Sequence, residues 1–322
     1  MKGTLMRTWL TDMFGLAVPV VCAPMAGVAD GALAAAVSRA GALGMVGVGA
    51  TATPEWITRE CRVAAAAGAP VGVGLQAWAL EHNPGQLDAV LAAGPALVSV
   101  SYGPYAKHLP RLQQAGLTVA TTVGNLQEAR AAEQAGIDVI VARGSEGGGH
   151  GRDEVGTLPL LQSVLDTVTT PVLAAGGIGT SRGVAAVVTA GAVGAWVGTA
   201  FLTCTEASTS RAARARLIAA TDTDTVYTRV FDIGARVGWP REFGERALRN
   251  QFHDRWAGHE EDLADDAAAA QEMTQAREVE CYDTACLDAG QGVALLHREL
   301  TAADVVAELA RADDLLRRAA AG

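Results

Sequence analysis

An Ala-Gly pair recurs along the first part of the chain at a nearly regular distance. Each pair closes an alanine-rich run and is followed within a few residues by an apolar run. A glycine just past the end of a helix takes the left-handed conformation that caps it. The pattern therefore predicts a repeated strand–helix unit. The first five pairs end at Gly41, Gly68, Gly94, Gly116 and Gly136.

Eight apolar runs predict strands within this repeat. They are near-continuous rather than alternating, as expected for parallel strands that are buried on both faces. Eight such strand–helix units predict a closed (β/α)8 barrel, the TIM barrel, over residues 1–220. A doubly wound open sheet is the alternative, but the first strand–helix turn, APMAGVAD, lacks the GxGxxG of a dinucleotide site. The predicted strands are 18–23, 43–48, 71–76, 97–102, 118–123, 139–142, 172–175 and 195–201.

The amino-acid composition changes after about residue 205, where charged residues become more frequent and glycine becomes rarer. Residues 207–220 predict the eighth helix. Residues 221–289 do not fit another strand–helix unit, and we expect a small helical extension over the barrel mouth. Residues 290–322 read as a glycine turn and an amphipathic helix that packs back on the barrel, with Thr301 and Asp304 in a capping box at its start.

Composition narrows the class of protein further. The formal charge of −10 disfavours nucleic acid or an anionic membrane surface as a partner. The five cysteines are odd in number and show no zinc-ligand spacing, which favours reduced thiols and no metal. No apolar run suits a signal peptide or a membrane span. We therefore expect a cytoplasmic protein without a membrane partner.

Glycines follow the last two predicted strands of the barrel. Gly176-Gly177 and Gly198-Thr199 lie where each strand gives way to a turn. A single such pair is more often only a tight turn between strand and helix. Two of them on adjacent final strands favour a phosphate site, because backbone N–H groups in a turn and at a helix N-terminus hold an anion without lysine.

His150 is the candidate catalytic residue. It lies in the run GSEGGGHG after the sixth predicted strand, on the face where barrel enzymes carry their active sites. An unperturbed histidine takes up or donates a proton near neutral pH. The alternative is a structural histidine in a flexible glycine loop. Glu146, just before the glycines, is expected to hold the loop through backbone N–H groups.

The runs PVVCAPMAGV, ARGSEGGGHG, PVLAAGGIGTSRG, GAWVGTAFL and AGQGVALLH resemble the nitronate monooxygenase family over nearly the whole chain. The resemblance implies a TIM barrel that binds FMN and oxidises alkyl nitronates or nitroalkanes with O2 to a carbonyl compound and nitrite. The histidine that matches His150 would be the base that removes the α-proton of a neutral nitroalkane. The residues implied at the cofactor are Ala23, Met25, Gln76, Thr122 and Gly148 near the flavin ring, and Gly176, Gly177, Gly198 and Thr199 at the phosphate.

Several positions depart from the common family pattern, among them Gly147, Gly151 and Arg152 in the glycine run and two positions near the flavin. Thr122 replaces a lysine that is often found beside the flavin, and Arg143 is a candidate to restore that positive charge from another strand. A similar glycine–histidine motif occurs in flavin-dependent enoyl-ACP reductases and in NADH:quinone reductases. An NAD(P)H-dependent reductase is therefore the alternative function, and a homodimer is compatible with either.

Overall fold

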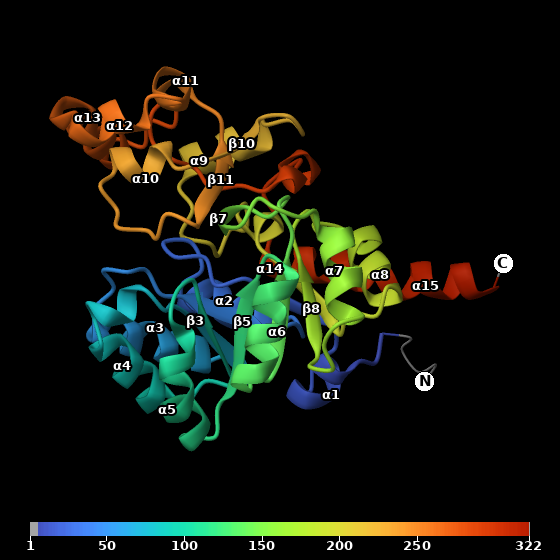
Figure 1. The fold of residues 1–322 in the computed structure, drawn as a ribbon. Helices are drawn as coiled ribbons and strands as arrows, with labels where there is room; N and C mark the ends of the chain where they lie inside the picture. The colour runs from blue at the N-terminus through green and yellow to red at the C-terminus, as the bar shows by residue number, and fades with distance from the viewer. Residues whose placement is uncertain (1–5, 322) are drawn as a thin grey trace.

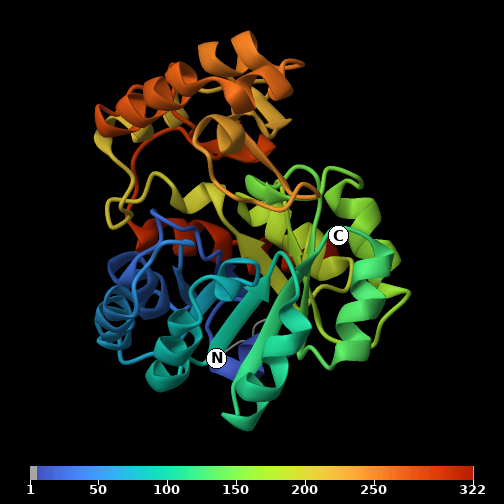
Figure 2. The same cartoon turned by 60° about the vertical axis from the view of Figure 1, so that its left-hand side comes forward.

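The computed structural model describes residues 6–321, and its main body is one sheet of eight parallel strands surrounded by helices (Figures 1 and 2). Neighbouring strands follow the order β1-β9-β8-β6-β5-β4-β3-β2. A parallel bridge between Val21 and Leu43 joins the first and last of these and closes the barrel, so the predicted TIM barrel is confirmed. The strands are β1 (Val20–Cys22), β2 (Gly44–Gly47), β3 (Val71–Gln76), β4 (Leu97–Ser101), β5 (Thr118–Val123), β6 (Val139–Arg143), β8 (Val172–Ala175) and β9 (Gly194–Val197).

Helices alternate with these strands on the outside of the barrel. Several end as the repeat predicts: Gly94 and Gly136 cap α4 and α6 with φ of 59° and 84°. The helices are α2 (Gly31–Arg39), α3 (Pro54–Ala65), α4 (Gly85–Ala93), α5 (Leu109–Gln114), α6 (Leu126–Ala135), α7 (Thr157–Leu165), α8 (Ser181–Thr189) and α9 (Arg211–Ile218).

A short helix that the sequence did not predict, α1 (Trp9–Phe14), closes the end of the barrel opposite the extension (Figure 1). Its side chains Leu10 and Phe14 are buried in one cluster with barrel residues such as Val141 and Leu173. This plug leaves the other end, where the strands have their carboxyl termini, as the place for a site.

Several strand bounds differ from the prediction by one or two residues, and the largest difference is at the last strand. The last strand ends at Val197, because residues Thr199–Phe201 turn into the 3-10 helix η3. Between β4 and β5 the chain forms two short helices, the 3-10 helix η2 (Tyr105–His108) and α5, with Pro110 in the first turn of α5. Proline has no N–H to continue the preceding turn and is tolerated at a helix start.

The extension after the barrel contains the expected helices and, in addition, two strands that the sequence did not predict. β10 (Thr225–Thr228) and β11 (Gly244–Leu248) pair antiparallel, and β11 also pairs with β7 (Gly149–Gly151) of the barrel. This sheet gives no local signal, since its third strand lies almost a hundred residues away and is two-thirds glycine. The helices are α10 (Val230–Gly234), α11 (Gln251–Trp256), α12 (Glu260–Asp265) and α13 (Ala267–Glu278).

The final segment returns to the barrel. After the 3-10 helix η4 (Gln291–Leu295), α14 (Ala302–Ala310) contacts α2 and α8, and α15 (Ala312–Ala321) contacts α8. The capping box of Thr301 and Asp304 is confirmed at the start of α14. The segment boundaries at 220 and 290 stay predictions, and residues 1–5 and 322 of the outer segments lie outside the described residues. Within residues 6–321, no helix is long and apolar enough to span a membrane.

Candidate active site

A cavity of about 610 Å³ lies between the carboxyl ends of the barrel strands and the extension. The barrel provides its floor, and residues of the extension such as Asp232 and Trp239 line its opposite side. All eleven residues predicted for catalysis or cofactor binding line it, so the structure brings them together. They are Ala23, Met25, Gln76, Thr122, Arg143, Gly148, His150, Gly176, Gly177, Gly198 and Thr199.

The two predicted phosphate turns lie side by side, because β8 and β9 are neighbours in the barrel. Gly176 and Gly177 both have positive φ, at 109° and 70°, a region that favours glycine. The chain then enters α8, whose N-cap residue Thr180 makes no side-chain capping bond. The backbone thus turns tightly into a helix N-terminus at the cavity, which suits an anion. The Thr199 hydroxyl accepts a hydrogen bond from the backbone N–H of Gly290, 3.0 Å away. This bond joins the turn after β9 to the glycine turn at residue 290.

Gln76 carries a polar atom that nothing in the described residues satisfies. Its Oε1 is buried and has no hydrogen-bond partner. Thr122, in contrast, is engaged, since its backbone N–H donates to Ser101 Oγ at 2.9 Å and its Oγ1 accepts from the same hydroxyl at 3.2 Å. A buried amide oxygen without a partner costs free energy unless a ligand supplies a donor. An unpaired buried hydrogen-bond acceptor and the two glycine turns thus line the same cavity, which suits a polar ligand that carries both a donor and an anionic group.

Arg143 is a buried cation at the end of β6, only 6% exposed. Its Nη2 donates to the carbonyl oxygens of Gly147, Gly148 and Gly149 at 2.6, 3.2 and 2.9 Å. Burial lowers the pKa of the Arg143 guanidinium below its usual value, with repulsion from Arg246 adding to that effect. The side chain we expected to supply a charge near the flavin is thus bonded to the glycine loop.

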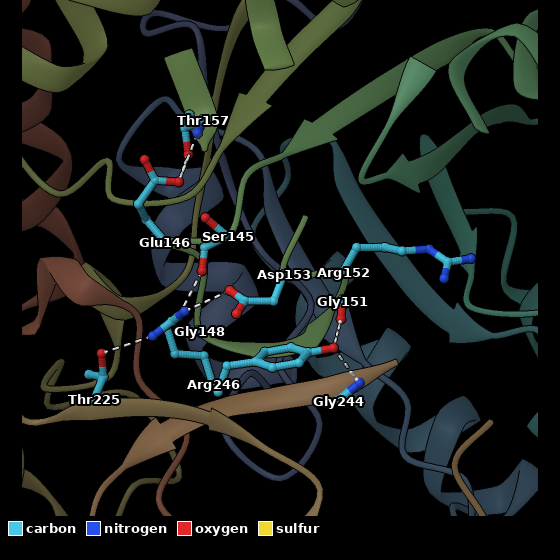
Figure 3. A network of polar contacts seen from close by, with 12 residues as sticks. Ser145, Glu146, Gly148, Gly151, Arg152, Asp153, Thr157, Thr225, Gly244 and Arg246 are labelled. Atoms are coloured by element: carbon cyan, nitrogen blue, oxygen red, sulfur yellow. Dashed lines mark hydrogen bonds and ion pairs between the residues drawn. The ribbon is translucent and has the colours of Figure 1, made fainter. Parts of the chain in front are cut away.

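Other polar contacts hold the same loop from outside (Figure 3). Glu146 accepts hydrogen bonds from the backbone N–H and hydroxyl of Thr157 at 2.7 and 2.8 Å, which ties the loop to the start of α7. Arg246 of β11 donates to the Ser145 carbonyl at 2.7 Å and pairs with Asp153 at 2.8 Å. The glycine run is therefore a fixed loop rather than a flexible one.

His150 lies in β7, opposite Glu245 of β11. Its Nε2 is 2.9 Å from Oδ2 of Asp232, and both side chains are largely buried. The indole of Trp239 stacks on the imidazole, with ring centroids 3.5 Å apart and planes 6° from parallel. Asp232 and Trp239 were missed in the sequence, because they lie more than eighty residues after His150 and belong to no motif around it.

Glu245 adds a buried acid beside this pair. Burial raises the pKa of Glu245 well above its usual value, and repulsion from Asp288 and Asp232 adds to the effect. Its Oε2 accepts from the Cys286 thiol at 3.3 Å, while its Oε1 is buried without a partner. Ligand atoms of His150, Asp232 and Glu245 lie within 4.8 Å of one another, a spacing that could also hold a cation. The absence of a metal stays a prediction.

Comparison with known proteins decides the family. The sequence model described as nitronate monooxygenase matches residues 7–85 and 75–312. The chain belongs to the nitronate monooxygenase family. It is accordingly an oxidoreductase, as the resemblance in its motifs implied.

Curated members and relatives of the nitronate monooxygenase family carry more than one activity in their names. A nitronate monooxygenase of Paraburkholderia phytofirmans is 35% identical over 265 residues, which cover 68% of this chain and 72% of that protein. A (3aS,4S,5R,7aS)-5-hydroxy-7a-methyl-1-oxo-octahydro-1H-indene-4-carboxyl-CoA dehydrogenase of Mycobacterium tuberculosis is 34% identical over 236 residues, 72% of this chain and 66% of that protein.

Two solved structures superpose on nearly the whole chain. FabK from Thermotoga maritima superposes with a TM-score of 0.84 at 27% identity, covering 98% of this chain and 99% of that one. A nitroalkane oxidase from Streptomyces ansochromogenes superposes with a TM-score of 0.82 at 30% identity, covering 97% and 99%. The fold is common to both structures, whereas the names of the curated relatives give different substrates.

Proposed function

We propose that this protein binds FMN at the barrel mouth and oxidises alkyl nitronates, or the nitroalkanes from which they form, with O2 to a carbonyl compound and nitrite. The observation that carries the proposal is that His150 and both glycine turns line one cavity. A proton-handling group and an anion cradle thus face the same space, which is what a flavin phosphate and an acidic C–H substrate require.

The residues that would hold FMN lie at the carboxyl ends of six barrel strands, β1, β3, β5, β6, β8 and β9. The backbone at Gly176, Gly177, Gly198 and Thr199 would bind the phosphate. Gln76 would use its unpartnered Oε1 to accept a hydrogen bond from the flavin ring. Ala23, Met25, Thr122 and Gly148 would border the ring.

When bound, FMN supplies the electron transfer to O2, and the protein supplies position and proton chemistry. His150 would remove the α-proton of a neutral nitroalkane, whereas a preformed nitronate needs no base. Arg143 and Arg246 keep the loop of His150 in place through its backbone carbonyls. Trp239 covers one face of the imidazole and limits the access of water to it.

A reductase that uses NAD(P)H is the second candidate. It is favoured by the high structural similarity to FabK and by the named dehydrogenase among the relatives. In that case the same cavity would accept a nicotinamide and an unsaturated or thioester substrate in turn, and His150 would donate a proton instead of removing one.

Identification of the flavin and of the product tests the proposal. The purified protein is denatured, the released flavin is separated from FAD and riboflavin standards, and nitrite is measured after reaction with nitroethane or ethyl nitronate in air. We expect FMN and nitrite. A protein that cannot be loaded with FMN, or that is loaded and forms no nitrite from either compound, contradicts it.

A further inference from the structure

The histidine of the site is held by two side chains from outside the barrel, Asp232 and Trp239 (the extension lies above the barrel in Figure 1). We propose that Asp232 is a positioning residue for His150. It keeps the imidazole proton on Nε2, leaves Nδ1 as the basic atom, and pairs with the imidazolium that forms when substrate is deprotonated. This inference rests on the proposed function of His150 as a base.

The geometry leaves Asp232 few other arrangements. Its side chain is 7% exposed and lies 2.9 Å from Nε2 of His150. It belongs to α10, which is anchored by the fully buried Phe231 in a cluster with Phe252 and Met273. The backbone carbonyl of Asp232 also accepts a hydrogen bond from Val237 at 2.9 Å. The carboxylate is therefore supported by a packed element rather than by a mobile loop.

The tautomer follows from the chemistry of the pair. An ionised carboxylate only accepts hydrogen bonds, so the imidazole nitrogen that contacts it must carry the proton. The other ring nitrogen, Nδ1, then has the free lone pair. When Nδ1 takes a proton from carbon, the ring becomes a cation directly beside Asp232, and a charge-assisted hydrogen bond replaces the neutral one.

Two neighbours strengthen this assignment. Trp239 stacks on the imidazole face and so opposes rotation of the ring that would exchange the two nitrogens. Glu245, the other buried acid at His150, has a pKa raised by burial and by repulsion from Asp288 and Asp232. Glu245 is bonded to the Cys286 thiol, whereas Asp232 is the carboxylate within hydrogen-bond distance of the ring.

The kinetic test compares two substrates that differ only in the need for a base. We expect Asp232→Asn to retain FMN and to lower kcat on neutral nitroethane by roughly 100-fold or more, as loss of an orienting carboxylate does in other acid–base dyads. We expect turnover of preformed ethyl nitronate to change by less than about threefold, since no C–H proton is removed. An equal loss of kcat on both substrates would show that the role of Asp232 is merely structural and would overturn the proposal.

A matched control is available in the same extension. Asp254 lies beside His253, with Oδ1 3.2 Å from its Nδ1, but is half exposed and away from the cavity lining. Asp254→Asn is expected to leave both rates unchanged. It controls for removing a carboxylate beside a histidine of the extension.

Nuclear magnetic resonance of the FMN-loaded protein labelled with ¹⁵N-histidine tests the tautomer without turnover. We expect His150, assigned by its loss in His150→Gln, to show a protonated Nε2 with a downfield N–H proton and a bare Nδ1. In Asp232→Asn that proton should move upfield, because an amide oxygen is a weaker acceptor than a carboxylate. A proton on Nδ1, or an N–H unaffected by Asp232→Asn, would refute the proposal even if the protein oxidised no nitro compound.

Discussion

At the scale of single residues, the run GSEGGGHG is glycine-rich because its backbone is packed from two sides. A Cβ on Gly151 would lie 2.3 Å from Nη1 of Arg143, and one on Gly148 would lie 2.5 Å from the backbone nitrogen of Gly290. Real side chains do not approach so closely. The glycines therefore let the loop wrap around the buried Arg143 guanidinium. The packed backbone in turn fixes the position of His150.

His150→Ala tests the catalytic role directly. We expect the variant to retain FMN and to lose roughly 100-fold or more of its activity on neutral nitroalkanes, because the general base is gone. Nitrite formation is the measurement. Alanine at His259, which is exposed on the extension, is the control. Full activity of His150→Ala would mean that the histidine is structural.

The phosphate turn can be tested by a single methyl group. Gly177 has φ of 70°, and an added Cβ would make only ordinary contact with Glu146, at 3.5 Å. Gly177→Ala should fold, with a strain of about 1 kcal/mol, and should weaken FMN binding about tenfold because the turn that bears the N–H groups must shift. FMN titration of the apoprotein measures this.

Gly68→Ala is the matched control for that variant. Gly68 has a similar φ of 65° with nothing within 4 Å of an added Cβ, and it does not line the active-site cavity. It should lose similar stability and keep its FMN affinity. Equal FMN affinity in Gly177→Ala and Gly68→Ala would contradict a phosphate role for the turn.

At the scale of elements, the three-stranded sheet joins the barrel to the extension through the loop that carries His150. β7 pairs with β11, and the Tyr227 hydroxyl of β10 donates to the Gly151 carbonyl at 2.9 Å. Arg246 adds a contact from β11 to both ends of the loop, at Ser145 and Asp153. The extension therefore fixes the catalytic loop as well as covering the cavity.

The variant Arg246→Met tests how much Arg246 contributes to holding the loop of His150 against β11. The change keeps the aliphatic stem but removes the hydrogen bond to Ser145 and the ion pair with Asp153. We expect the free energy of unfolding to fall by about 2 kcal/mol and kcat on nitroethane to fall with it. Denaturant unfolding and the nitrite assay give the two values.

Arg249→Met is the comparison within the same region. Its partner Asp254 and Arg249 itself are both about half exposed, so the pair contributes little to stability. If the free energy of unfolding fell no more in Arg246→Met than in Arg249→Met, the sheet would not depend on the contacts of Arg246 with Ser145 and Asp153.

Much of the barrel could be predicted because each strand–helix unit has a local signature. The β3, β5 and β8 strands have the predicted bounds. The recurring Ala-Gly pairs lie at helix ends, as at Gly94 and Gly136. β10 and β11 could not be predicted, since their pairing depends on a barrel loop distant in sequence. For the same reason Asp232 and Trp239 were missed: only the tertiary structure brings α10 and its following loop to His150.

At the scale of the whole molecule, one buried acid should couple stability to pH. Burial raises the pKa of Glu245 in the folded chain well above its usual value, with Asp288 and Asp232 adding repulsion. The folded chain therefore keeps a proton that the unfolded chain loses, and stability falls as pH rises from the unfolded pKa toward the folded one, by about 1.4 kcal/mol per pH unit across that window.

Glu245→Gln removes this titration while it keeps the size of the side chain. Its Tm should exceed that of the native protein by an increasing margin as the pH is raised from 5 to 8, with both proteins loaded with FMN. Thermal unfolding at several pH values checks this. A Tm difference that does not change with pH would mean that Glu245 is ionised in the folded chain.

Anaerobic stopped-flow spectroscopy of the FMN-loaded protein is the most direct test of the proposed reaction. One sample is mixed with ethyl nitronate, and others are mixed with NADH or NADPH. We predict rapid bleaching of the flavin absorbance with the nitronate and no comparable change with either nicotinamide. Rapid bleaching with NADH or NADPH alone, and none with nitronate, would contradict the account and assign the cavity to a reductase.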